Sequence, residues 1–240
     1  MIDTKGLYPV AIGCTGGSGS RALWGVLTAS PQIFMDQDIS PNAKDSQKSK
    51  TYLDLVNAPA ETIRPLIEAF LITILEQIPA GSETRYKYFG WKSPRNILQL
   101  DALFQAHPEL RFLHLIRDPA AMVNTSHPRK VYKREKASSD RSKLQNRAQY
   151  ILTNWAEVNL PVWEKHKNDP GYLLVHYEAL IQSPEQTIKS IYSWLQIDTA
   201  PFRDALSAIA PPEDAIDRGN NVDISSIAEA ARKLGYGHRL

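Results

Sequence analysis

The chain has 240 residues, of which 42% are hydrophobic and 22% charged, and its formal net charge is +2. This length and composition predict one soluble globular domain over residues 1–240 and exclude a disordered chain. The charge is too small to indicate a nucleic-acid-binding protein, and no apolar run is long enough to span a bilayer.

Strand-like and helix-like runs alternate along the chain. Short apolar runs predict strands at residues 8–13, 86–91, 111–116 and 172–176. Amphipathic runs, several of them opening on proline, predict helices at residues 20–30, 60–77, 93–104, from 119 onward, 146–167, 184–195 and 224–234. This alternation predicts an α/β fold with a central, mainly parallel sheet flanked by helices.

The first predicted strand runs into a glycine-rich turn, in the segment YPVAIGCTGGSGSRAL at residues 8–23. Glycines let the backbone approach a phosphate, backbone N–H groups point toward it, and the dipole of the following helix favours negative charge. Ligands of parallel α/β sheets bind beyond the carboxyl ends of the strands, where this turn would lie. The segment therefore predicts a site for a phosphorylated ligand.

Two common phosphate-binding patterns fit this turn poorly or only in part. A Walker A loop is excluded because no lysine follows the glycines at the required spacing. The dinucleotide pattern G-x-G-x-x-G/A does match at Gly17, Gly19 and Ala22, and Asp36 or Asp38 would be its later acidic residue. A dinucleotide-dependent oxidoreductase is therefore one alternative.

A third pattern fits more of the chain. Ser18, Gly19 and Ser20, with Leu23 close behind, resemble the G-x-x-x-R-S-G-T-T-L loop of sulfotransferases that use 3′-phosphoadenosine 5′-phosphosulfate (PAPS). Further segments resemble this family in the same order: WKSPRN (91–96), FLHLIRDPAAMVNTS (112–126), NWAEVN (154–159) and LLVHYEALIQSPE (173–185). The resemblance is strongest to tyrosylprotein and other Golgi-type sulfotransferases. It implies a P-loop-like three-layer fold and sulfuryl transfer from PAPS to a hydroxyl, or less readily an amine, without a metal.

The resemblance also implies how PAPS would be bound. The 5′-phosphosulfate would lie on the loop of Gly16, Gly17, Ser18, Gly19, Ser20 and Arg21. The 3′-phosphate would be held by Arg117, which offers a bidentate fork, and by the hydroxyl of Thr125 or its neighbour Ser126. Further nucleotide contacts are implied for Arg129, Tyr177 and Arg218. For Tyr177, a core tyrosine at the end of a strand is an equally good interpretation.

Two residues are implied in catalysis. Lys92 matches the lysine of the family in the WKSPRN segment, and an ammonium there would stabilise charge that builds on the equatorial and leaving oxygens. Asp38 matches the position of a glutamate that takes the proton of the acceptor, a role that requires a raised carboxyl pKa. Asp36 and His127 are alternatives for this base.

One position departs from the family pattern. Gly17 stands where the family has a basic side chain that helps to neutralise the phosphosulfate. Arg21 is our candidate replacement, because from the first turn of the helix its guanidinium could fold back over the loop. Without such a replacement the chain would bind nucleotide but transfer slowly, which makes a non-catalytic nucleotide-binding protein a second alternative.

Other features of the chain are less specific. The six histidines show no ligand spacing, so we expect no metal. Residues 127–143 carry seven Lys or Arg and two acids, which is typical of a solvated loop, of a lid over the donor or of a patch for an acidic acceptor. The sequence indicates neither an oligomeric state nor an acceptor class, so a peptide tyrosine, a sugar, a lipid and a small molecule all fit. A single cysteine and the lack of a signal-peptide pattern predict a cytoplasmic location.

Overall fold

The computed structural model describes residues 4, 6–35, 62–81, 85–125, 147–199, 202–207, 209, 219 and 221–239. Its strands are β1 (Tyr8–Cys14), β2 (Ile33–Met35), β3 (Tyr88–Lys92), β4 (Arg111–Ile116) and β5 (Tyr172–His176). Its α-helices are α1 (Ser20–Thr28), α3 (Ile63–Leu75), α4 (Leu100–Ala106), α5 (Pro119–Val123), α7 (Arg147–His166), α8 (Tyr177–Gln182), α9 (Pro184–Leu195), α10 (Phe202–Ser207) and α11 (Ala228–Lys233). Short 3-10 helices are η3 (Pro94–Gln99), η6 (Ser225–Ile227) and η7 (Gly237–Arg239).

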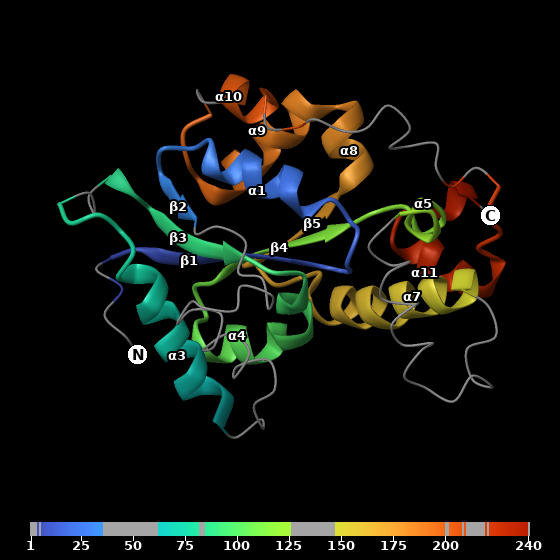
Figure 1. The fold of residues 1–240 in the computed structure, drawn as a ribbon, viewed down its shortest axis with the longest axis horizontal. Helices are drawn as coiled ribbons and strands as arrows, with labels where there is room; N and C mark the ends of the chain where they lie inside the picture. The colour runs from blue at the N-terminus through green and yellow to red at the C-terminus, as the bar shows by residue number, and fades with distance from the viewer. Residues whose placement is uncertain are drawn as a thin grey trace.

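The strands form one parallel sheet in the order β2-β3-β1-β4-β5 (Figure 1). In the central strand β1, Ile12 lies level with Lys92 of β3 on one side and with Leu113 of β4 on the other. The chain places β2 and β3 on one side of β1 and β4 and β5 on the other, so the carboxyl end of β1 is a topological switch point. The predicted parallel sheet is confirmed, and the glycine-rich loop begins at its switch point.

Helices cover both faces of the sheet and complete three layers. Figure 1 shows α1, α8, α9 and α10 over one face and α3, α4 and α7 over the other. Side chains alternate along β1, so Val10 and Ile12 enter the first core while Ala11 enters the second. In the second core, Phe70 of α3 packs edge-on against Trp91 of β3, with ring centroids 5.2 Å apart. The predicted three-layer α/β fold is confirmed.

A third apolar cluster joins α5, α7 and α11 beyond the end of β4. Its buried members include Ile116, Met122, Trp155, Ile227 and Leu234. The cluster matters for the site because it seats α11, the last described α-helix, beside the turn that follows β4.

Some elements differ from the sequence prediction. The short strand β2 and the helix α8 were not predicted, because each is too short to show a clear period. The helix predicted at residues 93–104 divides into η3 and α4, and within η3 the Asn96 side chain hydrogen-bonds to the backbone of β1. Among the described residues, none of the helices has both the length and the apolar character needed to cross a bilayer.

A buried polar network fastens α7 to the sheet. His114 of β4 accepts a hydrogen bond from the Tyr172 hydroxyl at Nδ1 (2.5 Å) and donates from Nε2 to the Asn159 side-chain oxygen (2.9 Å). This pairing assigns the neutral tautomer with its proton on Nε2. Burial lowers the pKa of His114 to about 4, which agrees with a neutral ring in the core.

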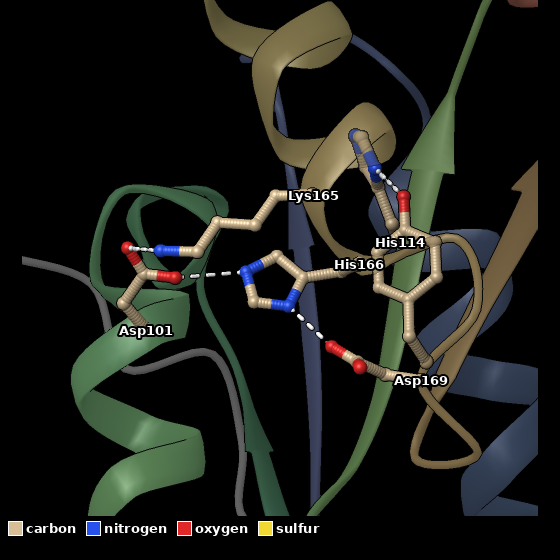
Figure 2. Close-up of polar contacts among 6 residues, drawn as sticks. Asp101, His114, Lys165, His166 and Asp169 are labelled. Carbon is tan, nitrogen blue, oxygen red and sulfur yellow. Dashed lines mark hydrogen bonds and ion pairs between the residues drawn. The ribbon is translucent and has the colours of Figure 1, made fainter.

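A second polar cluster lies beside this network, at the amino ends of β4 and β5. Figure 2 shows His166 of α7 between two carboxylates, 2.6 Å from Asp169 and 2.9 Å from Asp101. Lys165 also contacts Asp101, at 2.6 Å. Burial opposes ionisation of Asp101, but hydrogen bonds from Lys165 and His166 keep its pKa below the usual value. The cluster lies at the edge opposite the glycine-rich loop, so we assign it to the stability of the fold.

Candidate active site

The glycine-rich loop connects β1 to α1 and has a fixed internal shape. Gly17 and Gly19 have φ angles of 99° and 88°, a left-handed conformation that favours glycine. Ser18 is fully buried, and its hydroxyl donates to the Thr15 carbonyl at 2.7 Å. The Ser18 side chain therefore holds the loop together from inside.

The loop ends at the amino terminus of α1. Gly19 is the N-cap of this nine-residue helix and provides no side-chain cap. Ser20 begins the helix, and the following Arg21 is exposed to solvent. Amide groups in the first turn of a helix lack partners within the helix, and the helix dipole adds partial positive charge there. This arrangement suits an anion.

The ends of β4 and β5 meet the loop through an arginine and a tyrosine. Arg117, 5% exposed, has its guanidinium carbon 4.5 Å from the centre of the Tyr177 ring. Its Nη1 donates to the Gly17 carbonyl at 3.4 Å. A Cβ atom on Gly19 would lie 2.3 Å from Tyr177 Cε2, so only glycine fits under this ring. The structure thus brings together predicted residues from the loop and from the ends of two strands.

Thr125, the hydroxyl residue that follows Arg117 by eight positions, lies just after α5. It is buried, and its hydroxyl donates to the Met122 carbonyl at 3.0 Å. The Thr125 hydroxyl has one proton, so it could donate to a phosphate only if its bond to the Met122 carbonyl broke. Its oxygen lone pairs can still accept a hydrogen bond from a neighbouring donor.

Lys92 ends β3, the strand beside β1, and is 3% exposed. The backbone around it is fixed by Asn96. The Asn96 side chain accepts a hydrogen bond from Trp91 Nε1 and donates one to the Ile12 carbonyl, both at 2.8 Å. These bonds join the end of β3 to the end of β1, so Lys92 and the loop share one edge of the sheet.

The turn after Arg117 is held by partners that the sequence did not indicate. Asp118 is 2% exposed and caps α5 by accepting a hydrogen bond from Ala120 N at 2.8 Å. Its second oxygen lies 2.5 Å from Arg239 Nη2, and its backbone N–H donates to Glu178 at 2.9 Å. The Asp-Pro pair at the start of α5 is a recognisable capping signal, but nothing local in the sequence points to Arg239.

Some predicted residues lie outside the described part of the chain. These are the proposed base Asp38, its alternatives Asp36 and His127, and the predicted nucleotide contacts Ser126, Arg129 and Arg218. The basic segment 127–143 also lies outside it. Within the described residues, no group of three or more His, Cys, Asp or Glu side chains is arranged to hold a metal ion.

The chain is similar to known sulfotransferases over most of its length. A model of the sulfotransferase family matches residues 9–201, a range that includes the glycine-rich loop, Lys92, Arg117 and Tyr177. The chain is 24% identical to protein-tyrosine sulfotransferase 1 of Danio rerio over 244 residues, which cover 98% of this chain and 64% of that protein. The chain therefore spans slightly less than two thirds of the length of this relative.

Solved sulfotransferases share the fold. The sulfotransferase domain of the olefin synthase of Synechococcus PCC 7002 aligns with a TM-score of 0.59 at 15% identity, covering 96% of this chain and 95% of that domain. A mouse sulfotransferase, SULT7A1, solved in complex with PAP, aligns with a TM-score of 0.52 at 14% identity, covering 97% of this chain and 86% of its own. These likenesses concern the fold alone. The family match over most of the sequence gives no support to the dinucleotide alternative, and the chain belongs to the sulfotransferase family.

Proposed function

We propose that this chain transfers a sulfuryl group from PAPS to a hydroxyl, or less readily an amine, and releases adenosine 3′,5′-bisphosphate. The observation that carries the proposal is the convergence of three strand ends. The loop after β1, Lys92 at the end of β3 and Arg117 after β4 occupy the same edge of the sheet. This edge combines an anion-binding backbone with buried cationic side chains, as a nucleotide with anionic groups at both its 3′ and 5′ positions requires.

The described residues supply most of the proposed donor site. Backbone N–H groups around Gly16, Gly17, Gly19 and Ser20 would bind the 5′-phosphosulfate, aided by the start of α1. Arg117 and Thr125 would bind the 3′-phosphate. The Tyr177 ring would hold the Arg117 guanidinium in place through the cation–π contact between them. The donor would supply an activated sulfuryl group. We extend the proposal to Ser126, Arg129 and Arg218 from the family resemblance alone.

Two side chains would act on the reacting atoms. The acceptor oxygen would form a bond to sulfur while the bond between sulfur and the bridging oxygen of the 5′-phosphate breaks. Lys92 would stabilise the negative charge that develops on the bridging oxygen and on the sulfuryl oxygens. Asp38 would take the proton that the acceptor loses.

Arg21 could supply the positive charge that the family has at the position of Gly17. Arg21 lies on the first turn of α1 and is exposed, so its long side chain can turn toward the loop. We propose that Arg21 contributes to phosphosulfate binding. Replacing Arg21 with alanine should weaken binding of the bisphosphate by about tenfold, the effect of losing one charge-assisted contact. Exposed Lys189 offers a matched control, and an R21A affinity equal to that of K189A would contradict this role.

The first experiment is calorimetric titration of the purified chain with adenosine 3′,5′-bisphosphate, with ATP and NAD in parallel. Selective micromolar binding of the bisphosphate is the expected result. Binding of NAD without bisphosphate binding would overturn the proposal in favour of the dinucleotide alternative.

Transfer itself is tested with labelled PAPS and a panel of acceptors comprising a tyrosine peptide, sugars, lipids and small phenols. In wild-type protein we expect transfer to one of these classes. Replacing Lys92 with alanine should lower kcat at least about a hundredfold, while bisphosphate affinity changes much less. Tight bisphosphate binding without transfer to any acceptor would favour the non-catalytic alternative.

A further inference from the structure

The segment after α11 packs against the turn that carries Arg117. Trp155 of α7 lies between the two parts, since its Nε1 donates to the Arg117 carbonyl at 2.9 Å while its ring packs edge-on against Tyr236, with centroids 5.8 Å apart. The Tyr236 hydroxyl donates to Glu178 at 2.8 Å, and the other oxygen of Glu178 accepts from the backbone N–H of Asp118. The segment after α11 is thus connected to the turn after β4 in two ways, through Trp155 to Arg117 and through Glu178 to Asp118.

Arg239 completes this connection through the buried carboxylate of Asp118. The Asp118 side chain is 2% exposed, whereas that of Arg239 is 22% exposed. A carboxylate buried to this degree needs partners, and it has the Ala120 N–H and the Arg239 guanidinium. If Arg239 is removed, the nearest competing cation by sequence is Arg117, the adjacent residue. A shift of Arg117 toward Asp118 would draw it away from the loop and from the face of Tyr177.

We propose that Arg239 is a positioning residue for the donor site. By occupying Asp118, it keeps the guanidinium of Arg117 directed toward Gly17 and Tyr177, where it meets the 3′-phosphate of the nucleotide. Arg239 itself makes no contact with the ligand in this scheme. The inference rests on the proposed function, because it assigns the 3′-phosphate to Arg117.

The proposal is tested by the selectivity for a 3′-phosphate, the ratio of the affinities for adenosine 3′,5′-bisphosphate and adenosine 5′-monophosphate. Replacing Arg239 with alanine should lower this ratio by about tenfold through the bisphosphate affinity, since one charge-assisted contact to phosphate is weakened. R239K, which retains the charge, should recover most of the ratio. A merely structural role would weaken both nucleotides equally and leave the ratio unchanged, which would overturn the proposal.

Lys233 provides the matched control, because it lies at the end of α11 and pairs with Glu164 and Glu229 on the surface. K233A should keep the wild-type ratio, and a drop equal to that of R239A would contradict a specific role. In the background of D118N, which keeps the helix cap but removes the charge, the change at Arg239 should have little further effect. The double variant D118N/R239A leaves no buried charge unpaired. The affinity ratio can therefore still be measured in it if R239A alone fails to fold. A wild-type chain that shows no preference for the bisphosphate would instead refute the proposed function.

Discussion

Replacing Gly19 with alanine tests the geometry of the proposed donor site most directly. The φ angle of 88° costs an alanine about 1–2 kcal/mol relative to glycine. The new Cβ would lie 2.3 and 2.5 Å from two carbons of the Tyr177 ring. Carbon atoms prefer a separation of about 3.5–4.0 Å, so the ring would have to move by roughly 1 Å.

Such overpacking of a buried ring costs about 1–3 kcal/mol, so we expect G19A to lose about 3 kcal/mol of unfolding free energy in total. Because Arg117 lies over the same ring, bisphosphate affinity should also fall by about tenfold or more. Urea unfolding measures the first effect and calorimetric titration the second.

Gly81 supplies the control, because it has a φ angle of 81° and no atom within 4 Å of an added Cβ. G81A should therefore lose only the backbone part, about 1–2 kcal/mol, and bind the bisphosphate normally. Equal losses of stability in G19A and G81A, with unchanged binding in both, would refute the packing of Gly19 beneath Tyr177.

Two further predictions concern the polar groups around the sheet. N96A should lose about 1–3 kcal/mol of unfolding free energy, because Trp91 Nε1 would be buried without its acceptor. The same change should lower kcat, because the backbone beside Lys92 would be held less firmly. Urea unfolding and kinetics that match wild type would contradict both expectations. Below pH ~6.5 an unfolded chain binds a proton at His114, whereas the folded ring does so only near pH 4. The unfolding free energy should therefore fall by up to about 3 kcal/mol on acidification through this window. H114Q should show a shallower decrease when urea unfolding is compared at pH 7 and 4.5, and an identical pH dependence would refute the buried neutral ring.

The sequence by itself determined much of the secondary structure. The bounds of β4, β5 and α9 agree with prediction. In each case the spacing of apolar residues indicates the type of element, and local residues such as the proline that opens α9 mark where it begins. The glycine-rich turn, its place after the first strand and the parallel α/β class were readable for the same reason. Pro119 was likewise a local signal for the start of a helix, and α5 does begin there.

Tertiary structure alone decided how the site is assembled. Arg117 reaches the carbonyl of Gly17 across 100 residues of sequence, and Gly19 lies under a ring from the end of β5. Asp118 takes its charged partner from the last described turn, at Arg239. Propensity and periodicity describe neighbours along the chain, whereas these contacts depend on which strand ends and loops the sheet order places side by side. The sequence predicted candidate site residues in the loop and at the strand ends, but the contacts that orient them arise only from the packing of the sheet and its covering helices.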